Sequence, residues 1–202
     1  MNFQNQINKF GKELNNTYHN EFLEFINICI LMNFKILINK CNMKSEMIII
    51  TPEGVKNKGA NKLDTKSVFL AGTIDNGDSL NWQDKTIIEL INLGINNIEI
   101  YNPRREHWNS NPTKKEMEKQ IKWEQNHLDA ANIIAMVLLD DSKSPISLLE
   151  LGLYANTNKL IVFCTPNFYR WDNVRLTCEK YNIELVQDIN PLVIANKIIS
   201  KL

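Results

Sequence analysis

The sequence has little of what marks several common functional classes. It contains only three histidines, His19, His107 and His127, and four cysteines without metal-ligand spacing. We therefore expect neither a zinc site nor a Cys–His nucleophile pair. The 23 basic and 23 acidic residues balance and form no run of one sign, which disfavours nucleic acid or a membrane surface as a partner. Dispersed cysteines without a secretory context indicate reduced thiols in a cytoplasmic protein.

Long hydrophobic runs and glycine-rich nucleotide motifs are also missing. The apolar stretch 22–38 is interrupted by Glu24 and Lys35 and has no cleavage-site pattern, so it predicts amphipathic helix rather than a membrane span or a signal peptide. We interpret residues 1–45 as a helical extension that packs on the domain or on a partner subunit, and residues 46–202 as the functional domain. The segment after 67–72 lacks G-x-G-x-x-G, and there is no P-loop.

What is present is a regular alternation of strand-like and helical patterns. Short apolar runs bounded by turn residues predict strands at 47–51, 67–72, 98–101, 133–139, 160–164 and 183–186. Helical patterns lie between or after them, at 80–93, 114–131, 145–156, 171–181 and 191–202. This order predicts an α/β fold of the Rossmann-like, flavodoxin-like type, with a doubly wound, mainly parallel sheet of about five strands.

One acidic residue stands alone in the second half of the chain. Glu150 is the only charged residue between Lys143 and Lys159, on a predicted helix that follows the buried strand 133–139. Ligands of open α/β sheets bind at the carboxyl ends of such strands, so Glu150 is a candidate site residue. The alternative is a solvated helical stripe that Glu150 shares with Ser147 and other polar residues.

A second carboxylate lies on an apolar stripe. In the helix 114–131, apolar residues recur at intervals of three or four positions, and Glu124 takes the place in this series between Ile121 and Leu128. The apolar members of the series are Met117, Ile121, Leu128 and Ala131. A buried carboxylate is costly unless it is paired or hydrogen-bonded, so this position suggests a functional reason. The alternative is a glutamate whose stem packs while its head reaches water at the sheet edge.

Six segments, taken together, carry a family resemblance. In this order and spacing they resemble the nucleoside 2-deoxyribosyltransferase-like family over roughly residues 46–190. The segments are Phe69-Leu-Ala-Gly-Thr-Ile74, Trp82-Gln83, Asn102-Pro-Arg-Arg105, Gln120-Ile-Lys-Trp-Glu124, Leu148-Leu-Glu-Leu-Gly152 and Asp172-Asn-Val-Arg175.

The resemblance implies transfer of 2-deoxyribose between nucleobases through a covalent deoxyribosyl-glutamate intermediate. Glu150 matches the nucleophile, Glu124 the acid beside the leaving base, and Asn173 an asparagine that holds the sugar 5′-hydroxyl from a neighbouring subunit. The partners would be a deoxynucleoside and a free nucleobase, with no cofactor or metal, in a homo-oligomer that shares its sites between subunits. Further candidate substrate contacts are Gly72, Asp75, Trp82, Asn102, Arg104 and His107, with Arg105 and Trp108 beside them.

The chain departs from the family pattern at two places. Well-studied members have an acidic residue six positions before the nucleophile, where this chain has Ser144, although Asp140 or Asp141 could serve if the loop is shifted. A tyrosine of some members is Phe69 or Leu70 here. Both departures concern recognition of the base more than the sugar chemistry.

Two other functions stay open. An N-hydrolase of deoxynucleosides or their 5′-monophosphates would use the same residues with water as acceptor. Asp75 and Asp78 disfavour a bound phosphate, although Arg170 or Arg175 could compensate. A non-catalytic nucleoside sensor is the second alternative. Exposed aromatic side chains are expected over 168–171, beside Asn173, where one subunit would cap another's site.

Overall fold

The computed structural model describes residues 47–57, 65–106 and 111–202. The expected helical extension over 1–45 and the candidates His107 and Trp108 lie outside these ranges. The described strands form one sheet in the order β2-β1-β4-β3-β5-β6-β7. Their bounds are β1 Ile48–Thr51, β2 Gly54–Asn57, β3 Lys66–Gly72, β4 Ile98–Tyr101, β5 Ile133–Leu138, β6 Leu160–Cys164 and β7 Glu184–Val186.

The sheet confirms the predicted fold class and is larger than expected. All six predicted strands form and pair in parallel along the sheet, and β3 to β7 have the strand order of a flavodoxin-like fold. The seventh strand, β2, pairs antiparallel with β1 through a tight turn at the sheet edge. Its short sequence, Gly-Val-Lys-Asn, contains no apolar run from which a strand could be predicted.

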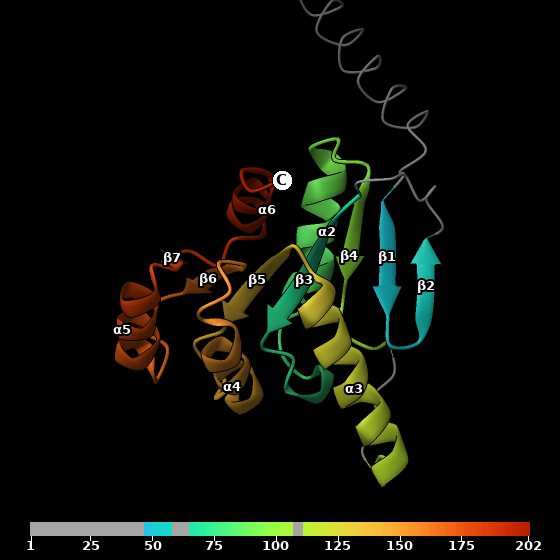
Figure 1. The fold of residues 1–202 in the computed structure, drawn as a ribbon, viewed down its shortest axis with the longest axis horizontal. Helices are drawn as coiled ribbons and strands as arrows, with labels where there is room; N and C mark the ends of the chain where they lie inside the picture. Colours follow the sequence, from blue (N-terminus) through green and yellow to red (C-terminus); the bar gives the residue numbers. More distant parts are fainter. Residues whose placement is uncertain (1–46, 58–64, 107–110) are drawn as a thin grey trace, which may run out of the picture. The chain divides into compact units, whose positions relative to one another are not determined.

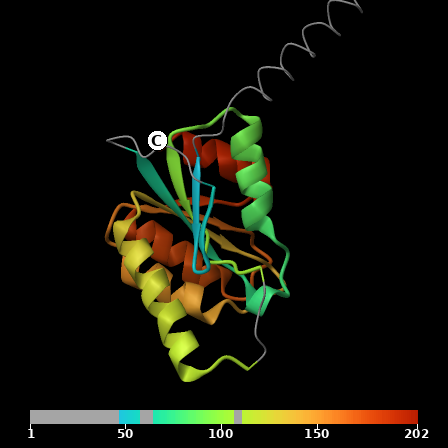
Figure 2. The same cartoon turned by 90° about the vertical axis from the view of Figure 1, so that its right-hand side faces the viewer.

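Helices cover both faces of the sheet, as Figures 1 and 2 show. Helices α2 and α6 lie on one face, and α3, α4 and α5 lie on the other. The predicted helices are all present, with shorter C-terminal ends in four of them. Their bounds are α2 Trp82–Asn92, α3 Lys114–Ala130, α4 Pro145–Tyr154, α5 Trp171–Tyr181 and α6 Pro191–Ile199.

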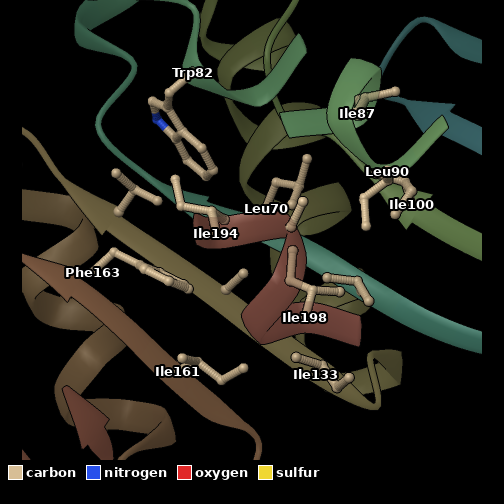
Figure 3. Packing of buried hydrophobic residues seen from close by; sticks show 14 of the residues in the cluster. Leu70, Trp82, Ile87, Leu90, Ile100, Ile133, Ile161, Phe163, Ile194 and Ile198 are labelled. Atoms are coloured by element: carbon tan, nitrogen blue, oxygen red, sulfur yellow. The ribbon is translucent and has the colours of Figure 1, made fainter. Parts of the chain in front are cut away.

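Alternating side chains of the strands build a separate core on each face. In β3, Val68 and Leu70 pack toward α2 and α6, whereas Phe69 and Ala71 pack toward α3, α4 and α5. Figure 3 shows the first core, in which Trp82 of α2 lies close to residues of β3 and α6. A strand covered on both faces has no polar side, which explains the continuous apolar runs.

The predicted apolar stripe of α3 is wrong in its first half. Leu128 and Ala131 are buried, but Met117 and Ile121 are exposed. The 17-residue helix extends well past the end of the neighbouring strands in Figure 1. At ~1.5 Å per residue it is about 25 Å long, more than the ~20 Å of the six-residue strand β5. Only the C-terminal half of α3 therefore packs on the sheet.

The chain turns to opposite faces after β3 and β5. The segment after β3 leads into α2 on one face, and the segment after β5 leads into α4 on the other, although the two strands are neighbours. In open α/β sheets this switch point is where ligands bind. Gly72 ends β3 there with a φ of 128°.

We predict that Gly72→Ala destabilises the fold by about 3 kcal/mol or more, measured by urea unfolding. An added Cβ would overlap the carbonyl oxygen of Val137 in β5, and the backbone angle is one that L side chains rarely adopt. Gly152→Ala is the matched control, because a Cβ at that helical position meets no atom within 4 Å. The control should be neutral or slightly stabilising. Equal effects of the two changes would contradict the close approach of β3 to β5.

Candidate active site

Helix α4 has the polar side chains of Ser147 and Glu150 on its inner side together with the core residue Leu151, and three other apolar side chains on its outer side. Ser147 is buried and Glu150 is half-buried, whereas Ile146, Leu149 and Leu153 are 60%, 59% and 64% exposed. The alternative that Ser147 and Glu150 lie on a solvated stripe is therefore wrong. This arrangement places two polar side chains inside the fold and leaves an apolar strip on its surface.

Glu124 of α3 and Glu150 of α4 lie close enough for their charges to interact. Burial raises the pKa of Glu150 from the ordinary 4.5 to about 8, and the charge of Glu124 contributes to the rise. The two helices are also joined by the hydroxyl of Tyr154, which donates to Asp129 Oδ1 at 2.7 Å. Within the described part of the chain, no group donates a hydrogen bond to the carboxylate of Glu150.

Among the described residues, Glu124 has a hydrogen-bond donor and Glu150 has none. Burial raises the pKa of Glu124, but a hydrogen bond from Gln120 and the charge of Arg105 oppose this effect. Gln120 Nε2 donates to Glu124 Oε1 at 2.6 Å, and Arg105 Nε donates to Gln120 Oε1 at 2.6 Å. Two carboxylates whose charges interact strongly titrate as a pair. The pair therefore retains a proton near neutral pH, and in the free protein the hydrogen bond to Glu124 favours Glu150 as its carrier.

Gln120 was not singled out from the sequence, although it belongs to a segment that carries the resemblance. The sequence feature that could have identified Gln120 is its spacing of four residues from Glu124, which puts both side chains on one face of α3. The amide nitrogen of Gln120 also donates to the carbonyl oxygen of Pro103 at 3.3 Å. Gln120 thereby joins α3 to the segment that follows β4.

Aromatic rings lie beside Glu124. Trp123 stacks on His127 with ring centroids 4.1 Å apart, and Tyr101 meets the same imidazole edge-on at 4.7 Å. Phe69 lies 6.1 Å from Trp123, on the face of the sheet that carries both carboxylates. Leu70 points to the opposite face, so Phe69 is the one that could occupy the place of the family's tyrosine.

A chain of hydroxyl groups ties the loops after β3 and β5 together. Thr73 Oγ1 and Ser144 Oγ are 2.6 Å apart, and Ser144 Oγ is 2.9 Å from Ser142 Oγ. Ser142 Oγ donates to Asp75 Oδ1 at 2.9 Å. Ser144 begins α4 in the left-handed conformation, with a φ of 43°. These bonds fix the start of α4 and hence the position of Glu150 along it.

Three predicted substrate contacts are held inside the framework. Trp82 has no exposed surface and donates from Nε1 to the Thr73 carbonyl oxygen at 2.9 Å. Asn102 donates to Asp84 Oδ1 at 3.2 Å and accepts from the backbone N–H of Arg104 at 3.0 Å. The Arg104 guanidinium donates to carbonyl oxygens of the loop after β3, at Gly77 and Ser79, both at 2.6 Å. Their roles in substrate binding stay predictions that this geometry does not favour.

The segment around Asn173 is partly as predicted. Asn173 is exposed in the first turn of α5, and its side chain makes no hydrogen bond within the described residues. Tyr169 is exposed, but the expectation that Phe168 is exposed is wrong, because it packs into the core between β6 and α5. Arg175 pairs with Asp172 and Glu179 on its own helix, whereas Arg170 stacks over Tyr169.

Other candidate groups are engaged elsewhere or absent. Asp140 accepts hydrogen bonds from Thr165 and Asn167 in the loop after β6, so it faces that loop. Among the residues that the structure describes, no three His, Cys, Asp or Glu side chains are placed to hold a metal ion. Across the same residues, no helix has the length and apolarity that crossing a membrane requires.

Comparison with known protein families assigns the chain to a family. A family model described as nucleoside 2-deoxyribosyltransferase like matches residues 65–168, just over half of the 202 residues. The chain belongs to this family. The matched range contains both carboxylates of this family member but ends before Asn173. A search of curated proteins found no match.

We predict that Glu150→Gln stabilises this family member at alkaline pH. The folded protein holds Glu150 protonated up to a pKa of about 8, against 4.5 for an ordinary glutamate, so its contribution to stability is complete below pH 4.5 and is lost as the pH rises to about 8. Glutamine mimics the protonated form at every pH. The difference in free energy of unfolding should be near zero at pH 4.5 and reach ~1–3 kcal/mol at pH 8.5, after allowance for screening by solvent.

Urea unfolding of both proteins across this pH range measures the difference. Glu118→Gln, at an exposed glutamate of α3, is the control and should give no such trend. A constant difference between wild type and Glu150→Gln at all pH values would show that Glu150 is well solvated.

Proposed function

We propose that this protein transfers 2-deoxyribose from one nucleobase to another through a covalent ester on Glu150. The supporting observation is the pair of desolvated carboxylates on α3 and α4, of which, among the described residues, Glu124 has a hydrogen-bond donor and Glu150 has none. A carboxylate without a protein partner is free to meet an electrophilic carbon. A carboxyl group with a raised pKa can give a proton to a leaving group.

The first half of the proposed reaction cleaves the N-glycosidic bond. Glu150, in its ionised form, attacks the anomeric carbon as the bond to the base breaks, and the base departs with the bonding electron pair. Glu124 gives its proton to a nitrogen of the base. Positive charge that develops on the sugar favours ionised Glu150, so the proton that Glu150 holds in the free protein is displaced toward Glu124 when substrate binds.

The second half reverses these roles. A second base enters, Glu124 removes a proton from its nitrogen, and that nitrogen attacks the anomeric carbon of the ester. Glu150 then leaves as a carboxylate, and a new deoxynucleoside forms. Burial of the pair serves both halves, because it keeps one shared proton available near neutral pH and slows attack by water on the ester.

The loop after β3 favours a nucleoside over its 5′-monophosphate. Asp75 accepts a hydrogen bond from Ser142, so a carboxylate lies at the carboxyl end of β3. Asp78 adds a second negative charge within the same loop. Both would repel a phosphate. Hydrolysis by the same pair, with water in place of the second base, is the second candidate function, and a pure binding protein would gain nothing from two desolvated carboxylates.

Chromatography of a deoxynucleoside incubated with and without a second free base distinguishes these functions. We expect a new deoxynucleoside in the presence of the second base, and free sugar without it at a much lower rate. Glu150→Gln should lower the exchange rate at least a thousandfold, because the amide cannot form the ester. Equal release of free sugar in both mixtures would make the protein a hydrolase, and no reaction would leave it a binding protein.

Glu124→Ala tests the acid separately. It should slow exchange strongly for bases that leave poorly and only slightly for an activated, halogenated base, because a stable departing anion needs no proton. Glu118→Gln is the control and should match wild type for both bases. Equal losses for good and poor leaving groups would make Glu124 a structural residue.

We also propose that a second copy of the chain completes the site. The apolar strip of α4, formed by Ile146, Leu149 and Leu153, lies on the helix that carries Glu150. Burial of such a strip between subunits is favourable, and a closed, symmetric oligomer is the simplest way to achieve it. Asn173, exposed and without a hydrogen bond among the described residues, would hold the sugar 5′-hydroxyl in the neighbouring subunit. We place the protein in the cytoplasm, in keeping with its buried free thiols at Cys164 and Cys178.

Subunit mixing tests this arrangement. Glu150→Gln and Asn173→Ala chains should each be inactive, and mixing them under exchange conditions should restore activity, because some sites then combine both intact residues. Leu153→Glu should shift the protein to a smaller species in size-exclusion chromatography, whereas Leu192→Glu, at an exposed leucine of α6, should not. Failure of the mixed chains to recover activity, despite proven exchange, would place Asn173 in its own subunit's site or in none.

A further inference from the structure

The hydrogen bonds of Gln120 allow only one orientation of its amide. Its two other partners are Arg105 Nε, which can only donate, and the carbonyl oxygen of Pro103, which can only accept. The amide oxygen must therefore face Arg105, and the NH₂ group must face Pro103 and Glu124. Gln120 consequently presents a donor, never an acceptor, to Glu124 Oε1 at 2.6 Å.

We propose that Arg105 and Gln120 are positioning residues that reserve Oε2 of Glu124 for the proton exchanged with the base. This inference rests on the proposed function and adds two residues to it. A proton on Oε1 would point at the N–H of Gln120, so the neutral carboxyl group carries its proton on Oε2 and accepts on Oε1. The same oxygen, Oε2, then delivers the proton to the departing base and takes it back from the incoming one.

The fixed donor also determines how readily the proton is released. A donated hydrogen bond stabilises the carboxylate form of Glu124, which opposes the effect of burial on its pKa. Arg105, from the segment after β4, acts in the same direction through its charge. Glu150 on α4 opposes the charge of Glu124 only in its own ionised form, and the charge of Glu124 in turn raises the pKa of Glu150. These are the charged groups that act on Glu124 within the described residues.

The chain of contacts runs from Arg105 through Gln120 to Glu124. Arg105 can be substituted without changing any residue of α3. In Arg105→Met the amide oxygen of Gln120 loses its donor, and Glu124 loses a nearby positive charge that stabilises its carboxylate form. In Arg105→Lys an ammonium group can still donate to the amide oxygen. The two variants differ in the donor and keep a side chain of comparable length, which makes them a matched pair.

The experiment follows the titration of Glu124 by carbon-13 NMR of glutamate carboxyl groups, with Glu124→Gln used to assign the signal. The pKa of Glu124 should rise in Gln120→Met, because the donor to Oε1 is removed, and in Arg105→Met, because the nearby positive charge and the donor to the Gln120 oxygen are removed. It should stay near the wild-type value in Arg105→Lys. Gln125→Met, at an exposed glutamine of the same helix, should leave the titration unchanged. Circular dichroism of each variant shows whether it is folded.

Kinetics supply the second readout. In Gln120→Met and Arg105→Met, kcat for exchange should fall about tenfold or more with KM changed less than threefold, and the pH profile of kcat/KM should move to higher pH. Arg105→Lys should restore most of kcat. Unchanged titration of Glu124 in folded Gln120→Met and Arg105→Met would overturn the inference even if exchange occurs. Absence of exchange in wild type would overturn the proposed function alone, since the titration needs no substrate.

Discussion

Much of this fold serves to hold two carboxylates close together with little access to water. Glu124 and Glu150 each disfavour the charge of the other, so their proximity lowers stability at neutral pH. The contacts between α3 and α4, with Leu128 and Leu151 in one core and Tyr154 bonded to Asp129, hold the two helices in place against this effect. A protein of marginal stability keeps such a pair only where it serves a purpose, and glycosyl transfer is a chemistry that uses it.

Polar residues near the carboxyl ends of the strands build the support for that pair. Thr73 and Ser144 join the loops after β3 and β5 through their hydroxyl groups. The Arg104 guanidinium holds the loop after β3 by donating to carbonyl oxygens of that loop. Because Ser144 immediately precedes α4, this network sets where Glu150 lies. A residue in a family motif can thus contribute to the site without touching the substrate. It does so by fixing the helix or loop that carries the reacting group. Gln120 does the same for Glu124 through a single, oriented hydrogen bond.

The sequence was sufficient for the helices and for six of the seven described strands, because periodicity reports local burial directly. The helix Trp171–Tyr181 has its predicted bounds. Periodicity does not report how far a helix extends beyond its sheet, which is why the exposed Met117 and Ile121 were predicted to be buried. Nor does it report which face of a helix is inward when apolar residues occur all around it, as in α4. Contacts between distant segments, such as Gln120 with Arg105, depend on the folded arrangement and had no local signal.

The central claim is that Glu150 forms a covalent bond with the sugar. Acid quenching of the wild-type protein during turnover of a 2′-deoxynucleoside, followed by protease digestion and mass spectrometry, tests it most directly. The account predicts a peptide containing Glu150 that is heavier by one deoxyribosyl group, with fragment ions that place the added mass on Glu150, and no such peptide from Glu150→Gln. An unmodified Glu150 peptide under conditions of proven exchange, or the added mass on another residue, would contradict it.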